Sequence, residues 1–220
     1  MKISIITVCK NPGESLKKTI ESVLSQTYQD IEYIIIDGLS TDGTLDIIKK
    51  YEKEVSSRHA SRVTLHCVSE PDTGIYNAMN KGTTLASGDY LLFLNAGDYL
   101  VDGDVISKVV ENIEKDGGLC DIYFGDIISE DPATMERYEV PNRLKNINSL
   151  KLFFWTVPHA AAFIKKDALT KVGGYDESFK ISADYYFFVK AFVAQKMKFN
   201  NISLNVSVFQ TGGISSDPRN

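Results

Sequence analysis

Residues 2–37 read KISIITVCKNPGESLKKTIESVLSQTYQDIEYIIID, and this stretch decides the fold class. Its two ends, residues 2–9 and 32–37, are runs of apolar and β-branched residues that predict buried strands. Between them, a turn at Pro12 precedes residues 13–27, whose apolar side chains recur every three or four positions as in an amphipathic helix. A strand, a helix and a second buried strand in this order are typical of a parallel α/β sheet.

The alternation of strand and helix signals continues to about residue 128 and then becomes irregular. Further strands are expected at residues 63–68, 90–94, 121–126 and 202–209, and helices at residues 44–53, 75–86, 105–113, 167–172 and 183–195. In the last helix, the buried face is expected to consist of Phe188, Val189, Phe192 and Val193. We predict a single α/β domain over residues 1–220, in which residues 1–128 form a Rossmann-like, mostly parallel sheet flanked by helices and residues 129–220 form an irregular half.

Composition narrows the class of protein further. The 220 residues are 43% hydrophobic and 24% charged, as in a globular protein with a sizeable core. The formal net charge of −5 provides no overall basic field for nucleic acid or an anionic membrane, and leaves only a local basic patch open. The three cysteines are far apart and lack metal-binding spacing, so we expect small buried thiols. The sequence shows no signal peptide and no apolar run long enough to cross a bilayer, and we expect a soluble, cytoplasmic protein.

Polar side chains follow four of the predicted strands at their carboxyl ends, where open α/β sheets bind their ligands. In chain order they are Thr7, Asn11, Asp37, Asp72, Asn95 and Asp98. Each alone is explained equally well as a turn, cap or loop residue, but together they exceed what turns require. The sequence has neither G-x-G-x-x-G nor a P-loop, and carboxylates would repel a diphosphate unless a divalent cation lay between them. This pattern favours a nucleotide held through Mn²⁺ or Mg²⁺.

Five segments, in this order along the chain, resemble the motifs of family-2 glycosyltransferases with the GT-A fold. They are ISIITVCKN at 3–11, IIIDGLSTDGT at 34–44, DTGIYNAMNKG at 72–82 followed by ASGDY at 86–90, GGYDE at 173–177, and ADY at 183–185. The resemblance covers most of the chain. It implies a single glycosyltransferase domain, in which residues 1–128 bind a nucleotide sugar and residues 129–220 face the acceptor.

The resemblance also implies roles for individual residues. Asp184 would be the catalytic base, and Asp98 the metal ligand in the D-x-D region, where Asn95 and Gly97 replace the usual carboxylates. The residues expected to bind the donor are Thr7, Asn11, Asp37, Asp72, Lys81 and Asn95, with Asp37 on the base and Lys81 able to replace part of the cation's charge. The expected reaction is inverting transfer from a nucleotide-diphospho-sugar, with UDP as the expected nucleotide.

His159 has two readings. A lone histidine beside an apolar strand is, slightly more often than not, a half-buried structural residue. In the resembling family its segment leads to the acceptor half, so the functional alternative is a metal ligand or an acceptor contact.

The resemblance also implies the kind of acceptor. The expected acceptor is a saccharide or a lipid-linked saccharide of bacterial cell-surface polysaccharide or glycolipid synthesis, through which the protein could associate peripherally with a membrane.

Two other functions remain in competition with glycosyl transfer. A nucleotidyltransferase would need a glycine-rich, cationic loop after the first strand, which residues 11–14 do not provide. A catalytically degenerate sugar-nucleotide-binding protein would account for Asn95 and Gly97, but Asp184 is retained. Hydrolysis of the donor distinguishes an enzyme from a binding protein.

Overall fold

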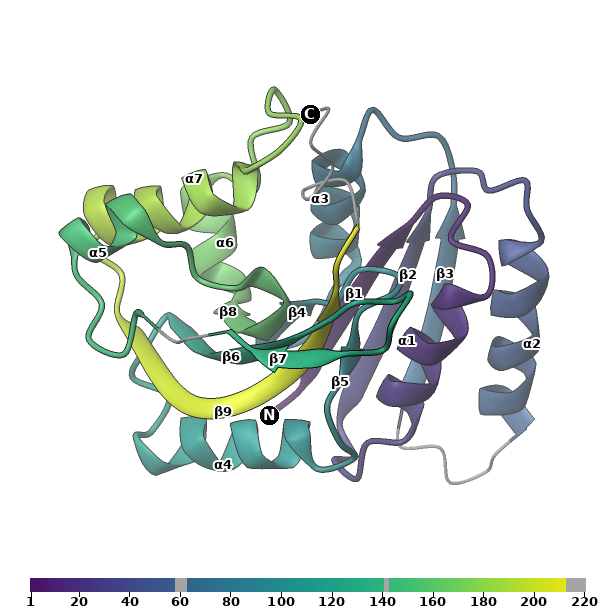
Figure 1. Ribbon diagram of the computed structural model, residues 1–220, viewed down its shortest axis with the longest axis horizontal. Helices are drawn as coiled ribbons and strands as arrows, with labels where there is room; N and C mark the ends of the chain where they lie inside the picture. The colour runs from purple at the N-terminus through teal and green to yellow at the C-terminus, as the bar shows by residue number, and fades with distance from the viewer. Residues whose placement is uncertain (58–62, 141–142, 213–220) are drawn as a thin grey trace.

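The computed structural model describes residues 1–57, 63–140 and 143–212 (Figure 1). The strands are β1 (Ile3–Cys9), β2 (Ile31–Asp37), β3 (Val63–Ser69), β4 (Tyr90–Phe93), β5 (Tyr99–Leu100), β6 (Ile122–Glu130), β7 (Arg137–Glu139), β8 (Ala162–Lys165) and β9 (Phe199–Gln210). The helices are α1 (Ser15–Leu24), α2 (Thr44–Ser57), α3 (Ile75–Leu85), α4 (Val105–Lys115), α5 (Ser149–Phe154), α6 (Lys166–Val172) and α7 (Ala183–Val189). A 3₁₀ turn at His159–Ala161 and a π-helical turn at Lys190–Ala194 complete the described elements.

The strands form one sheet in the order β3-β2-β1-β4-β8-β6-β9-β5, with β7 paired to β6. The pairs β1–β2, β2–β3 and β1–β4 are parallel, which confirms the Rossmann-like half. The half expected to be irregular contributes β8, which lies between β4 and β6 and is antiparallel to both. The sheet is therefore mixed. β8 has only four residues, so its place in the sheet comes from distant pairing and not from a local sequence signal.

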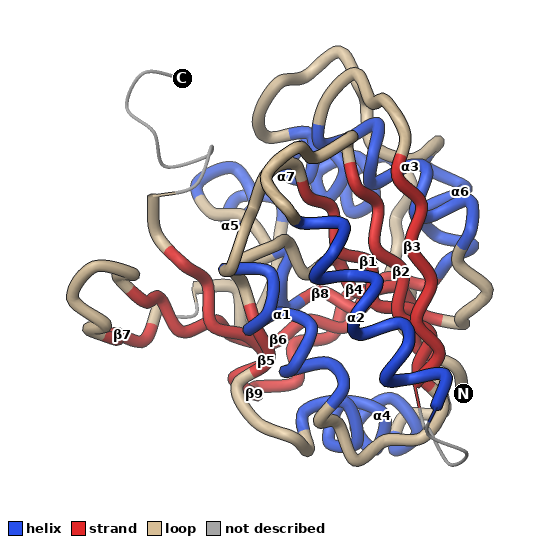
Figure 2. The backbone as a smooth tube through the Cα atoms, turned by 90° about the vertical axis from the view of Figure 1, so that its right-hand side faces the viewer, coloured by secondary structure: helices blue, strands red, loops and turns tan. Residues whose placement is uncertain are grey.

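Helices cover both faces of the sheet, as Figures 1 and 2 show, and an apolar layer lies between the sheet and the helices on each face. Alternate residues of β1 divide between the two layers: Ile5 packs with α1, α2 and α4, whereas Ile6 packs with α3, α6 and α7. Gly82 permits the close approach of α3, because a Cβ there would overlap the Ile6 side chain. The expected α/β domain is thus confirmed. The division expected between residues 128 and 129 falls inside β6.

The helix expected over residues 183–195 is regular only as far as Val189. The π-helical turn that follows adds a residue to the turn and so rotates the remaining side chains. Val193, expected on the buried face, is consequently 40% exposed, while Phe187 and Ala191 are buried.

The structure can be compared with two further expectations from the sequence, the buried thiols and the lack of a membrane-spanning segment. All three cysteines are free thiols, but each is partly accessible and not fully buried. Within the described ranges, every helix is too short or too polar to cross a bilayer. His59, to which the sequence assigned no role, lies outside the described residues.

Candidate active site

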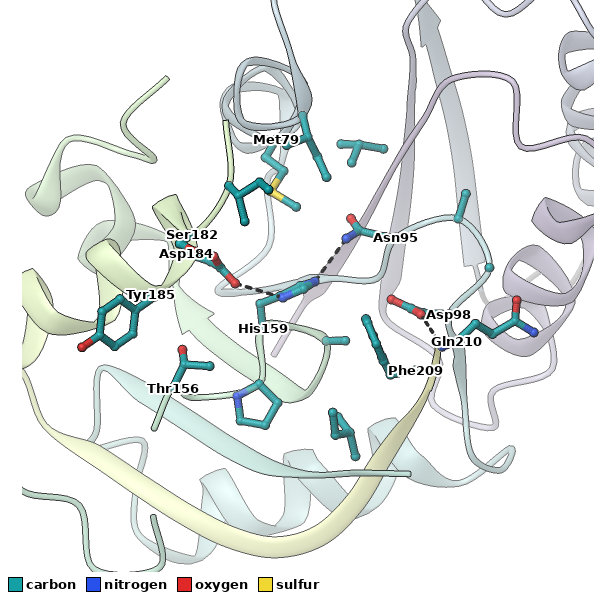
Figure 3. Close-up of a pocket in the computed structure, with 18 of the residues that line it drawn as sticks. Met79, Asn95, Asp98, Thr156, His159, Ser182, Asp184, Tyr185, Phe209 and Gln210 are labelled. Atoms are coloured by element: carbon teal, nitrogen blue, oxygen red, sulfur yellow. Dashed lines mark hydrogen bonds and ion pairs between the residues drawn. The ribbon is translucent and has the colours of Figure 1, made fainter. Parts of the chain in front are cut away.

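A cavity of about 1320 Å³ opens at the carboxyl ends of β1 and β4, between α3 and α7. Its size exceeds the roughly 300–1,000 Å³ typical of a site for one small ligand. Five of the residues singled out from the sequence line it together, namely Asp72, Asn95, Asp98, His159 and Asp184. Figure 3 shows the last four around one hollow, supplied by segments that are far apart in the chain.

The carboxylate of Asp184 is held from two sides. Asp184 is the second residue of α7, and the fully buried Ala183 before it anchors the start of the helix in the core. The Tyr76 hydroxyl donates to Oδ1 over 3.2 Å, and Nδ1 of His159 lies 3.2 Å from Oδ2. Burial opposes the charged form, but the hydrogen bond and charge of His159 outweigh it and lower the pKa of Asp184 below 3.8. Asp184 is therefore an ionised carboxylate in the cavity wall at neutral pH.

His159 links this carboxylate to the end of β4. Pro158 precedes the 3₁₀ turn that begins at His159, and the ring lies between Asp184 and Asn95 (Figure 3). Its Nε2 is 3.1 Å from Nδ2 of Asn95. Neutral His159 satisfies both contacts when Nδ1–H donates to Asp184 and Nε2 accepts from Asn95. Burial opposes protonation of the ring, but the bond to Asp184 and its charge raise the pKa of His159 above 6.5.

Asp98 occupies the other side of the hollow. Its side chain is almost completely buried, and Oδ1 accepts the backbone N–H of Gln210 over 3.0 Å. Burial raises the pKa of Asp98 to about 6, although the bond from Gln210 and the proximity of His159 act in the opposite direction. The second carboxylate oxygen points into the cavity (Figure 3).

The site offers few ligands for a metal ion. Among the described residues, no group of three or more His, Cys, Asp or Glu side chains is placed to hold one. Asp98 is available as one carboxylate, and Oδ1 of Asn95 is buried without a hydrogen-bond partner. Mg²⁺ and Mn²⁺ sites in nucleotide enzymes commonly use one or two protein oxygens and complete their shell with phosphate. Asp98 and Asn95 thus fit a cation that a bound ligand would bring or share, and not a preformed metal site.

Two expected donor ligands, Thr7 and Asp37, are fully buried and do not line the cavity. The Thr7 hydroxyl donates to the Leu94 carbonyl over 2.6 Å. The Asp37 carboxylate accepts the backbone N–H of Ser40 over 3.0 Å and the hydroxyl of Ser69 over 2.6 Å. Both side chains have the parity of Ile5 and Ile35 on their strands and so face the α1–α2–α4 layer.

Asn11 and Lys81 also lie outside the cavity lining. Asn11 organises the adjacent loop, because its Oδ1 accepts the backbone N–H of Thr41 over 2.7 Å. Lys81 forms an ion pair with Glu70 at 2.8 Å and donates to the Pro71 carbonyl. Within the described residues, the cationic side chains that do line the cavity are Lys10, Arg143 and Lys180, together with His159.

Two sequence motifs meet in the structure through Asn80. Its Oδ1 accepts the Tyr175 N–H and its Nδ2 donates to the Tyr175 carbonyl, each over 2.9 Å. Asn77 and Asn80 also donate to Glu177 at 2.9 and 2.8 Å. Gly174, at φ +75°, leaves room for this approach. Helix α3 thereby fixes the loop that leads to Asp184. The sequence does not indicate the contact between Asn80 and Tyr175 or the hydrogen bond between Tyr76 and Asp184. Each of these contacts joins residues about a hundred positions apart.

Comparison with known proteins identifies the family. The sequence model for "Glycosyl transferase family 2" matches residues 4–173. The chain belongs to glycosyl transferase family 2. An uncharacterized glycosyltransferase of Mycobacterium tuberculosis, Rv1514c, is 34% identical over 193 residues, covering 86% of this chain and 68% of that protein. A PGL/p-HBAD biosynthesis glycosyltransferase of Mycobacterium bovis is 31% identical over 189 residues, covering 86% of this chain and 69% of that protein.

Solved structures show that this family-2 chain has the GT-A fold. Staphylococcus aureus TarS in complex with UDP-GlcNAc aligns with a TM-score of 0.78 at 18% identity, covering 98% of this chain and 60% of the TarS chain. The mannosyltransferase PcManGT of Pyrobaculum calidifontis, in complex with GDP-Man and Mn²⁺, aligns with a TM-score of 0.72 at 16% identity, covering 94% and 56%. The chain therefore spans somewhat more than half the length of these structural relatives.

Proposed function

We propose that this family-2 protein transfers a sugar from a UDP-sugar to an acceptor hydroxyl, with inversion at the anomeric carbon. The observation that carries the proposal is a carboxylate held on one wall of a large cavity, opposite a second, buried carboxylate at the end of β4. Asp184 and Asp98 occupy these two positions. Two carboxylates with opposite pKa shifts suit two different tasks, since Asp184 stays ionised while Asp98 titrates near pH 6.

Asp184 is the proposed base. An acceptor hydroxyl is a weak nucleophile, and a positioned base that removes its proton during attack contributes roughly 10²–10⁴-fold to the rate. The oxygen of the acceptor bonds to the anomeric carbon, its proton passes to Asp184, and the bond between that carbon and the diphosphate breaks. Tyr76 and His159 each donate to one oxygen of Asp184 and leave a lone pair on each for the substrate. These two donors thereby orient the Asp184 carboxylate and leave it able to accept a hydrogen bond from the acceptor hydroxyl.

The donor's diphosphate is proposed to lie near Asp98 and Asn95. A divalent cation there would neutralise the charge that develops on the leaving group. Asp98 and the unpaired Oδ1 of Asn95 would be its protein ligands. The fit to a cation supplied together with the diphosphate agrees with the Mn²⁺ named for the PcManGT complex. Lys10 and Lys180 also line the cavity and are better placed than Lys81 to add positive charge.

The acceptor is proposed to be a saccharide or a glycolipid precursor. The cavity volume of about 1320 Å³ leaves room for a second sugar beside a nucleotide sugar. The relative of Mycobacterium bovis is named for the biosynthesis of PGL and p-HBAD, which supports a glycolipid setting. Asp72 would contribute to the donor side, since its carboxylate lines the cavity and accepts the Gly74 N–H.

Titration calorimetry with a panel of nucleotide sugars, with and without Mn²⁺, tests the proposal. A UDP-sugar should bind more tightly than its GDP and CDP counterparts, and removal of the cation should weaken its binding. Asp184→Asn should bind the same donor with unchanged affinity. Equal binding of all nucleotides, or no binding of any of them, would refute the assignment of the cavity to a UDP-sugar.

A further inference from the structure

Helix α5 turns apolar side chains toward solvent. Leu150 is 70% exposed, Phe153 74% and Phe154 63%, whereas Leu152 is buried in the core. The rings of Phe153 and Phe154 pack edge to face at 5.2 Å, and Trp155 extends the cluster at 5.7 Å. In a helix of the core, such aromatic side chains would be buried. Here they contact one another at the surface. A contiguous exposed apolar patch of this kind marks a surface that another phase or molecule covers.

The same segment has a charge opposite to that of the chain. Residues 143–155 include Arg143, Lys145 and Lys151 and no acidic residue, in a protein of net charge −5. In the described parts of the chain, none of these three cations forms an ion pair. The Arg143 guanidinium lies 5.4 Å from the Trp155 ring, so charge and aromatic surface are adjacent. We call Leu150, Phe153, Phe154 and Trp155, with these three cations, the aromatic–basic face.

This face borders the mouth of the cavity. Trp155 and Arg143 belong to both, because they also line the cavity. The Tyr185 hydroxyl donates to the Phe153 carbonyl over 3.4 Å, which ties α5 to α7, and Figure 1 shows these two helices side by side at one end of the molecule. A ligand bound to the aromatic–basic face would therefore lie next to the acceptor side of the cavity.

We propose that the aromatic–basic face binds an anionic lipid surface and presents the cavity to an acceptor anchored in that surface. Only the second claim, that the cavity is presented to an anchored acceptor, rests on the proposed function. Aromatic side chains favour the interface between headgroups and acyl chains, and lysine and arginine near it are attracted to anionic lipids. Lysine is depleted at protein–protein interfaces, so the exposed Lys145 and the half-buried Lys151, neither of which forms an ion pair among the described residues, favour lipid over a protein partner. The six residues of α5 would lie in the interface and not cross it.

Flotation with lipid vesicles tests the proposal. The full chain should float with vesicles of phosphatidylcholine containing 30% phosphatidylglycerol, and not with phosphatidylcholine alone, and added salt should weaken the binding. Two double variants test the aromatic and the basic contributions to lipid binding. The first combines Phe153→Ser with Phe154→Ser, and the second combines Lys145→Gln with Lys151→Gln. Each should lower the partition coefficient at least about tenfold. None of these four side chains lines the cavity.

Matched controls use residues of the same kind elsewhere on the surface. Leu119, which is 67% exposed, is changed to Ser, and Lys49 and Lys50 of α2 are changed to Gln. These variants should bind vesicles as the parent does. The proposal is overturned if the parent does not bind anionic vesicles, or if the α5 variants bind as well as the controls. It is also overturned if sedimentation velocity shows that the patch forms a dimer in place of binding lipid.

Turnover of a UDP-sugar without vesicles separates this inference from the proposed function. If vesicle binding fails while turnover persists, only the membrane surface is wrong. If vesicle binding holds while no UDP-sugar binds or turns over, the proposed glycosyl transfer is wrong and the lipid surface stands.

Discussion

Replacing the imidazole of His159 tests how the proposed base is held. His159→Phe keeps a ring of similar size but removes the donor to Asp184 Oδ2 and the partner of Asn95. A hydrogen bond to a charged group is worth about 1.5–3 kcal/mol. If that bond orients Asp184 in the transition state, turnover should fall roughly 10- to 150-fold.

The pH profile distinguishes this role from a general loss of packing. Burial without His159 favours the neutral form of Asp184, so its pKa should rise and the acid limb of the turnover profile should move to higher pH. His159→Asn places a neutral donor near the position of Nδ1 and should recover part of the rate. The measurement is turnover of a saturating UDP-sugar from pH 4 to 8, with circular dichroism to verify folding. An unmoved acid limb and a rate within about twofold of the parent would refute the positioning role.

The same pair predicts a window of pH-dependent stability. The raised pKa of His159 means that its stabilising contribution is complete below 6.5 and is lost as pH rises through that pKa. The lowered pKa of Asp184 means that its contribution is complete above 3.8 and is lost as pH falls. The difference in melting temperature between the parent and His159→Phe should therefore be largest between about pH 4 and 6.5. A difference that stays constant from pH 4 to 9 would contradict the ion pair.

Three further changes probe the cation, the buried charge and the sheet. Enhancement of donor affinity by Mn²⁺ should decline as pH falls through about 6, where Asp98 gains a proton, and should be nearly absent in Asp98→Asn; calorimetry at pH 5, 6 and 7.5 measures both. Glu130 is fully buried among Tyr99, Arg137 and Lys18, whose hydrogen bonds outweigh burial and lower its pKa to about 2. Glu130→Gln should thus reduce the free energy of unfolding, measured in urea at pH 7, by about 1–3 kcal/mol. The stability that Glu130 provides should be complete above pH 4.5 and should be lost as the pH falls toward 2. Gly125→Ala should destabilise by about 1–3 kcal/mol because its Cβ would overlap the Leu204 carbonyl across β6 and β9; a neutral effect would mean that the strands can separate freely there.

Much of the fold follows from local signals. The apolar strands and amphipathic helices of residues 1–128 were predictable because each shows its own periodicity, and parallel neighbours then follow from short alternating segments. The position of β8 was not predictable in the same way. It depends on pairing a four-residue strand with β4 and β6, which lie far away in the sequence.

The site could be predicted in part for a related reason. Asn95 and Asp98 follow a strand directly, so the sheet edge brings them to the cavity as expected. Thr7 and Asp37 also come from strand ends, but their side chains are buried in hydrogen bonds with the protein and do not line the cavity. The bond from His159 to Asp184 requires the tertiary structure, since no local pattern joins a 3₁₀ turn to the start of α7.

The central claim is that Asp184 takes the acceptor's proton in a nucleotide-sugar transferase, and one comparison tests it most directly. Asp184→Asn keeps the size of the side chain and its place at the start of α7, but it cannot accept the proton. Turnover of the UDP-sugar that binds the parent should fall roughly 10²–10⁴-fold, while the melting temperature and the affinity for UDP stay near the parent values. Full transfer activity in the Asn variant would contradict the account.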